Sequence, residues 1–208
     1  MFDFITDLDA YFCEKYANYD KLCVLPGYRM PKMQTSEVRE DGRTYAYTLP
    51  ANTMRLANQE DKAELLKELK KRMSDKTFSF SFRTVGIFTR IKNVFSKYAP
   101  HKWLKDIFAK CGTTSEEAGA LLSIDKTIWK GICKGKYLPT KNLLFSLALT
   151  SQIGVDYTKD LFAVCGYEFD FTFEKDVVVS YLLEQKVYNR PMIDAALAEY
   201  KVTNLFLA

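Results

Sequence analysis

The sequence predicts a mainly α-helical protein with a small α+β unit at its N-terminus, on three observations. Apolar residues recur at helical spacing through most of the chain. Asp41-Gly42 separates two extended runs, residues 34–40 and 43–49, as in a β-hairpin whose turn needs positive φ. Residues 113–154 contain start signals for successive helices joined by short connections.

The N-terminal unit, residues 1–85, is expected to combine two helices with the hairpin. Helical spacing predicts one helix over residues 3–17 and another over residues 58–73. Thr77–Arg83 alternates aromatic and polar residues with period two, which predicts a third strand. The apolar positions are Phe4, Leu8, Tyr11, Phe12 and Tyr16 in the first helix and Leu56, Ala63, Leu66 and Leu69 in the second. No function follows from this unit.

The remaining chain, residues 86–170 and 171–208, is expected to be helical and to pack on that unit. The helix after Gly86 has apolar residues at helical spacing, so we expect one buried face, with its aromatic residues in the core. These residues are Ile87, Phe88, Ile91, Val94, Phe95 and Tyr98, followed by Trp103. Pro100 ends this helix or starts the next, over residues 101–110. Later helices are predicted over residues 156–164, 173–185 and 191–200.

The positive charge is concentrated in the middle of the chain. The net charge is +4, but residues 83–141 hold 12 Lys/Arg and 4 Asp/Glu, which gives 12 − 4 = +8. Residues 1–82 are neutral and residues 142–208 carry 5 − 9 = −4. A basic segment of this kind is the electrostatic footprint of phosphate binding.

Residues 113–154 read as a helix, a tight turn, a second helix, a linker with one proline, and a third helix. Thr114-Ser-Glu-Glu117 is a capping box at the start of the first helix. Asp125 and Thr140 stand where they would cap the second and third helices. The linker is Gly135-Lys-Tyr-Leu-Pro139-Thr140.

Over about residues 113–160 this segment resembles the λ-repressor-like helix-turn-helix family, also called the XRE or Cro/C1 type. The resemblance implies a tri-helical core, DNA binding and dimerisation. It also implies that Gly119 lets the first two helices cross closely. Two positions depart from the family pattern, because Ser123 stands for the glycine of the turn and Ser115 for a common glutamine. The matching apolar positions are Leu122, Ile124, Ile128 or Trp129, Ile132 and Ala148.

From Thr113 to its end the chain also resembles a C-terminal module that is appended to intracellular signalling and macrodomain-type proteins of Firmicutes. That resemblance does not define a ligand. Its marks are Leu138-Pro-Thr-Lys141, Thr158-Lys-Asp-Leu161, Gly166-Tyr167, Tyr181-Leu-Leu183 and Ala195-Ala-Leu197.

These features predict a nucleic-acid-binding regulatory protein, with DNA as the expected partner through the helix-turn-helix. We expect the second helix of the motif and its linker to contact DNA through Lys126, Thr127, Lys130, Lys134 and Lys136. We expect the phosphate backbone to be held by Arg90, Lys97, Lys102 and Lys105. The outward positions of the second helix offer no Arg, Asn or Gln for bidentate base contacts, so phosphate contacts should dominate.

The main alternative is a non-enzymatic protein-interaction adaptor, for instance in a bacterial signalling or defence system, that uses the same fold. It would need an exposed apolar patch, and the candidates are Phe78, Phe80 and Phe82, or the C-terminal Leu205-Phe-Leu207. A homodimer through the helices 173–185 and 191–200 is also expected. Residues 86–99 are amphipathic enough for a membrane surface. We nevertheless expect no membrane partner, because a helix between other elements normally packs inside.

No catalytic residue, metal ligand or cofactor site is expected. The five cysteines form no C-x-x-C pair, and His101 is the single histidine, so they predict free thiols in a reducing compartment. An enzyme would need His101 gathered with Cys13 or Cys23 and carboxylates. No apolar run approaches the roughly 20 residues that span a bilayer. The acidic N-terminus is unlike a signal peptide, so a cytoplasmic protein is expected.

Overall fold

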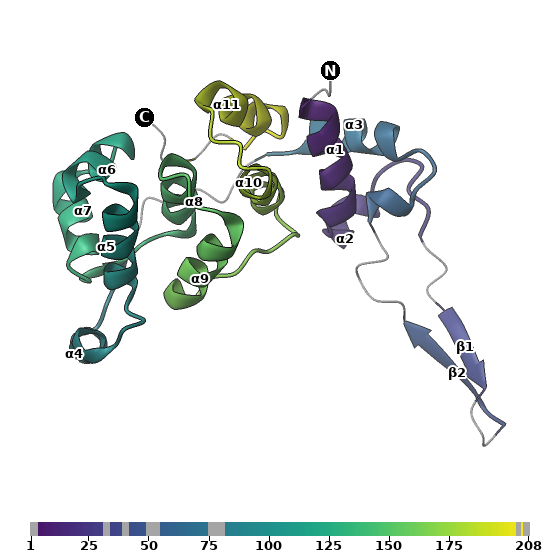
Figure 1. Ribbon diagram of the computed structural model, residues 1–208. Helices are drawn as coiled ribbons and strands as arrows, with labels where there is room; N and C mark the ends of the chain where they lie inside the picture. The colour runs from purple at the N-terminus through teal and green to yellow at the C-terminus, as the bar shows by residue number, and fades with distance from the viewer. Residues whose placement is uncertain are drawn as a thin grey trace.

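The computed structural model describes residues 4–30, 34–38, 42–48, 55–74, 82–202 and 205, and these residues are mainly helical (Figure 1). The N-terminal elements are α1 (Phe4–Lys15), α2 (Tyr19–Leu22), β1 (Gln34–Val38), β2 (Thr44–Thr48), the 3₁₀ helix η2 (Leu56–Asn58) and α3 (Lys62–Arg72). The middle elements are β3 (Arg83–Thr84), α4 (Ile87–Phe95), α5 (Pro100–Cys111), α6 (Ser115–Leu121), α7 (Lys126–Cys133), β4 (Tyr137–Leu138) and α8 (Lys141–Thr150). The last helices are α9 (Val155–Cys165), α10 (Glu174–Glu184) and α11 (Arg190–Glu199).

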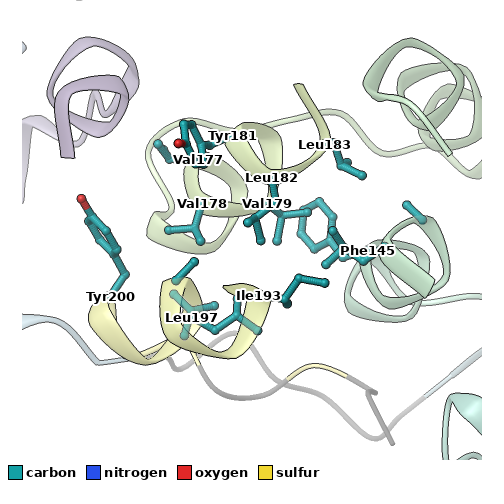
Figure 2. Close-up of a cluster of buried hydrophobic side chains, with 14 of the residues drawn as sticks. Phe145, Val177, Val178, Val179, Tyr181, Leu182, Leu183, Ile193, Leu197 and Tyr200 are labelled. Carbon is teal, nitrogen blue, oxygen red and sulfur yellow. The ribbon is translucent and has the colours of Figure 1, made fainter. Parts of the chain in front are cut away.

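Helix α10 is the central helix of the molecule. Every residue from Glu174 to Leu183 is buried, and the helix contacts α1, α8, α9 and α11. A helix that is buried on all sides needs apolar residues around its whole circumference, and the run Val177–Val179 supplies them. Figure 2 shows Val178, Val179 and Leu182 facing Ile193 and Leu197 of α11 and Phe145 of α8, while Val177 lies beside Tyr181.

Three consecutive charged residues, Glu174–Asp176, are buried at the start of α10. Each has a partner, because a buried charge without one is strongly unfavourable. The Tyr16 hydroxyl and the Lys21 ammonium donate to Glu174 at 2.7 and 2.6 Å, the Lys175 ammonium donates to Asn142 at 3.1 Å, and Lys141 pairs with Asp176. Polar contacts therefore tie α10 to the α1–α2 region on one side and to α8 on the other.

The predicted apolar face of the first helix is confirmed, since Leu8, Phe12 and Tyr16 are fully buried. The hairpin is also confirmed. Strands β1 and β2 pair antiparallel from Gln34↔Thr48 to Val38↔Thr44, and the pair projects away from the helices (Figure 1).

The third strand was expected to extend the hairpin. Residues 75–81 lie outside the described residues, and Arg83–Thr84 instead pair with Tyr137–Leu138, just after α7. The amide of Val85 continues this pairing by donating to the carbonyl of Lys136 at 2.9 Å. The segment that precedes α4 is therefore attached to the linker after α7.

One expectation about packing is wrong. The helix after Gly86 has no buried residue, and Phe88, Phe95 and Tyr98 are exposed instead of lying in the core. The dimer expected through the last helices stays a prediction. Residues 174–183 of α10 are buried within the chain and α11 turns Ile193, Ala196 and Leu197 inward, so a second copy would have to use the outer side of α11.

Candidate nucleic-acid interface

The ends of α6, α7 and α8 are capped as the sequence predicts. Thr114 and Glu117 form a reciprocal capping box at α6. The carboxylate of Asp125 accepts from the amides of Thr127 and Ile128 at 2.8 and 3.0 Å at the start of α7. The hydroxyl of Thr140 accepts from the amide of Leu143 at 3.2 Å at the start of α8. These caps fix where each helix begins, and so fix which residues of α7 face outward.

Helices α6 and α7 cross where α6 has no side chain. A Cβ atom on Gly119 would lie 2.6 Å from Cδ1 of Trp129, so only glycine fits there. The indole Nε1 donates to the carbonyl of Ser115 at 2.5 Å, and its ring lies 5.8 Å from that of Phe108 on α5. Trp129 therefore holds α7 against both α6 and α5.

The turn between α6 and α7 contains a residue in the left-handed region. Ser123 has a φ of 49°, and the amide of Ile124 donates back to the carbonyl of Gly119 at 3.3 Å. Leu122 is fully buried beneath this turn. Ser123 thus adopts the backbone conformation that favours glycine, at a cost of roughly 1–2 kcal/mol.

The outward face of α7 is basic. Lys126, Lys130 and Lys134 recur at i, i+4 and i+8, and all three are exposed, while Trp129 and Ile132 point to the core. Thr127 on α7 and Lys136 in the linker after it are exposed as well. Within the described residues, none of these four lysines has a carboxylate within ion-pair distance.

Six lysines elsewhere in the described chain are paired with carboxylates. The ion pairs are Lys21–Glu174, Lys70–Asp9, Lys70–Glu199, Lys71–Glu68, Lys110–Asp106, Lys141–Asp176 and Lys159–Asp156. In the part of the chain that the structure describes, exposed lysines such as Lys62 and Lys67 have no ion pair either, so what distinguishes α7 is that three unpaired lysines lie in one row on one helix face.

The remaining four candidate residues are divided between two places. Arg90 lies on α4 and Lys97 just after it, and α4 projects from the group formed by α5, α6 and α7 (Figure 1). The ammonium of Lys102 donates to two carbonyls at the end of α4, those of Val94 at 2.6 Å and Ser96 at 2.9 Å. Lys102 is thus engaged in holding α4. Lys105 is exposed on α5.

Two glycines, one near the end of α7 and one just after it, make close contacts that the sequence did not predict. Gly135 has a φ of 69°, and a Cβ atom there would lie 2.8 Å from Nδ1 of His101. A Cβ atom on Gly131 would lie 2.4 Å from the ring of Tyr137. Among the described residues Nδ1 of His101 is buried without a hydrogen-bond partner. Burial first, and then the charges of Lys105 and Lys102, lower the pKa of His101, so it is neutral at pH 7.

His101 and Cys13 do not meet. His101 lies on α5, on the far side of α10 from α1, which carries Cys13 (Figure 1). Burial raises the pKa of the Cys13 thiol to about 11, which leaves it protonated and unreactive. A hollow of about 850 Å³ lies between α1 and α3, where Lys70 is paired with Asp9 and Glu199. In the described part of the chain, no group of His, Cys, Asp and Glu could hold a metal ion.

The described residues carry one exposed apolar patch, and the patches suggested from the sequence lie largely outside them. Phe82 and Leu205 are partly buried against the core, and Phe78, Phe80, Phe206 and Leu207 lie outside the described residues. The exposed apolar residues are concentrated on α4.

The chain was compared with known protein families, proteins and structures. No protein-family model, no curated protein and no solved structure matches this chain. Over the residues that the structure describes, no helix has both the length and the apolar character needed to cross a membrane.

Proposed function

We propose that this protein is a nucleic-acid-binding regulator that uses α6 and α7 as a λ-repressor-like helix-turn-helix, with α7 facing the duplex. The observation that carries the proposal is the face of α7, where Lys126, Lys130 and Lys134 are exposed in one row without carboxylate partners. Such a row is complementary to a phosphate backbone.

The packing of α7 supports this orientation. Trp129 and Ile132 hold the opposite side of the helix in the core, so the lysines cannot turn inward without breaking that packing. The cap at Asp125 and the tight crossing at Gly119 fix the helix along its length. The lysine ammonium groups contact phosphates well but distinguish bases poorly, so we expect weak dependence on sequence.

The test is binding to a labelled random-sequence DNA duplex, followed by fluorescence anisotropy at increasing salt. If Lys126, Lys130, Lys134 and Lys136 each neutralise a phosphate, the log–log slope should be about −3 to −4. Lys130→Glu should weaken binding about tenfold at low salt and reduce the slope by about one or more. Lys67→Glu, the same change at an exposed lysine of α3, is the matched control and should have little effect.

Two results would contradict the proposal. Equal losses in Lys130→Glu and Lys67→Glu would mean that net charge, and not the face of α7, determines binding. A folded protein that fails to bind duplex at low salt would favour the second candidate, a protein-interaction adaptor. The observation that favours the adaptor is the exposed apolar side of α4, which a protein partner could cover.

A further inference from the structure

Helix α4 turns its polar side toward the rest of the protein. Thr89 and Asn93 line a hollow of about 350 Å³ between α4, the start of α5 and β4. The large apolar side chains of α4 lie on its other side, and Phe88 and Phe95 are each 84% exposed. This is the reverse of the usual arrangement, in which an amphipathic helix buries its apolar stripe.

The apolar and polar residues of α4 lie on separate sides of the helix axis. At about 100° per residue, the apolar side chains share one side that covers about a third of the circumference. These residues are Ile87, Phe88, Ile91, Val94 and Phe95. Arg90 lies at one border of this stripe and Lys92 at the other, while Thr89 and Asn93 lie opposite. Long cationic side chains at both borders of an apolar stripe can extend to the headgroups of a lipid surface.

The charge around α4 has a single sign. Residues 76–105 contain no Asp or Glu, whereas residues 83–105 contain six Lys and Arg. Tyr98, which follows the helix and is 73% exposed, lines the same hollow as Thr89 and Asn93 and is not part of the apolar stripe.

We propose that α4 is an interfacial helix that inserts its apolar side chains into the surface of an anionic lipid bilayer. A bilayer would contact only the outer side of α4, which is the apolar side, because the polar side faces the protein. A second copy of this chain fits less well, because α4 against α4 would bring together two sets of Arg90 and Lys92. A helix about 14 Å long is also short for the roughly 800 Å² per partner of a stable interface.

This inference goes beyond the proposed nucleic-acid binding and uses a different helix. Lys102 helps to present α4, because its ammonium binds the carbonyls of Val94 and Ser96 at the end of the helix. The two surfaces can therefore be tested separately, by substitutions on α4 and on α7.

The first experiment is co-sedimentation of the full chain with vesicles of phosphatidylcholine alone or in an equal mixture with phosphatidylglycerol. We expect binding to the mixed vesicles and much weaker binding to the neutral ones, about fivefold for each cation engaged. Phe88→Ser/Phe95→Ser should weaken binding to the mixed vesicles by at least roughly 30-fold. Phe88→Leu/Phe95→Leu is the matched control and should retain most of it. Both pairs lie at exposed positions, so folding should be unaffected.

The second experiment measures insertion directly. Phe95→Trp places an indole on the apolar side, and vesicles that contain brominated phosphatidylcholine should quench its fluorescence beyond the contribution of Trp103 and Trp129. Lys130→Glu should leave this quenching in place, which separates insertion from general attraction to the basic face of α7.

Three results would overturn the proposal. One is the absence of binding to mixed vesicles. Another is binding that the serine pair does not weaken, or that occurs without quenching at position 95, because attraction would then be purely electrostatic. The last is a dimer in light scattering that the serine pair dissociates, without vesicle binding, which would assign the apolar side of α4 to a second copy.

Discussion

Gly119 of α6 lies directly against the indole of Trp129 of α7, and a Cβ atom on Gly119 would be 2.6 Å from Cδ1, 2.9 Å from Nε1 and 3.0 Å from Cγ. This contact sets how closely the two helices approach. Trp129 is 4% exposed, so it has no space into which it could move. The orientation of α7, and with it the direction of its lysines, therefore depends on the absence of one methyl group.

Gly119→Ala should destabilise the protein by about 1–2 kcal/mol, because overpacking outweighs the gain of about 1 kcal/mol in helix propensity. Denaturant unfolding gives the value. In a Trp129→Leu background the same substitution should cost less, since the smaller side chain relieves the clash. Equal costs in the two backgrounds would mean that the indole does not set the crossing.

Ser123→Gly should stabilise the protein by about 0.5 kcal/mol. Glycine removes the strain of a serine in the left-handed region, which raises the free energy of unfolding by roughly 1–2 kcal/mol. Glycine also makes the unfolded chain more flexible, which lowers the free energy of unfolding by about 0.4–1 kcal/mol. Ser123→Ala keeps the strain and should bring no gain. Shifts in the urea midpoint compare the two variants, and a destabilised glycine variant would contradict the left-handed turn.

The parts of the fold that the sequence predicted well depend on neighbours along the chain. Caps at Thr114, Asp125 and Thr140 are interactions over two or three residues, so their signals are local.

What the sequence did not reveal depends on contacts between distant segments. The apolar spacing of α4 is the same whether the stripe faces a core or the solvent, and periodicity alone does not say which. The pairing of Arg83–Thr84 with Tyr137–Leu138 joins segments more than 50 residues apart. The burial of three adjacent charges at the start of α10 likewise requires partners from α1, α2 and α8, which no local pattern reveals.

Lys141→Met should be far more destabilising than Lys110→Met. Lys141 pairs with Asp176, whose side chain is 5% exposed, whereas Lys110 pairs with Asp106 at the surface. Leaving a buried carboxylate without its cation costs about 3–5 kcal/mol, and losing an exposed pair costs about 0–1 kcal/mol.

The cost of Lys141→Met should also depend on pH. Burial raises the pKa of Asp176 and the charge of Lys141 opposes this, so without Lys141 the pKa rises further. The folded variant then binds a proton more tightly than the unfolded chain, and its stability falls as pH rises above the unfolded pKa of about 4. The destabilisation should therefore be smaller at pH 4 than at pH 7. An equal cost at both pH values would show that Asp176 remains ionised.

The single histidine gives a second prediction about pH. Burial, and then the charges of Lys105 and Lys102, lower the pKa of His101 in the folded state, so the unfolded chain binds its proton more readily. Stability contributed by neutral His101 is present at pH 7 and is lost as pH falls through the unfolded pKa of about 6.5. The urea midpoint of unfolding should therefore decrease between about pH 7.5 and about pH 5.5, which is about one unit on either side of the unfolded pKa of histidine.

The control is His101→Gln, which keeps a side chain of similar polarity against Gly135 and does not titrate. Because the chain has no other histidine, this variant should lose the decrease in midpoint above pH 5.5. A decrease that persists in His101→Gln would assign the pH dependence to another group, and would contradict the lowered pKa of His101 beside Gly135.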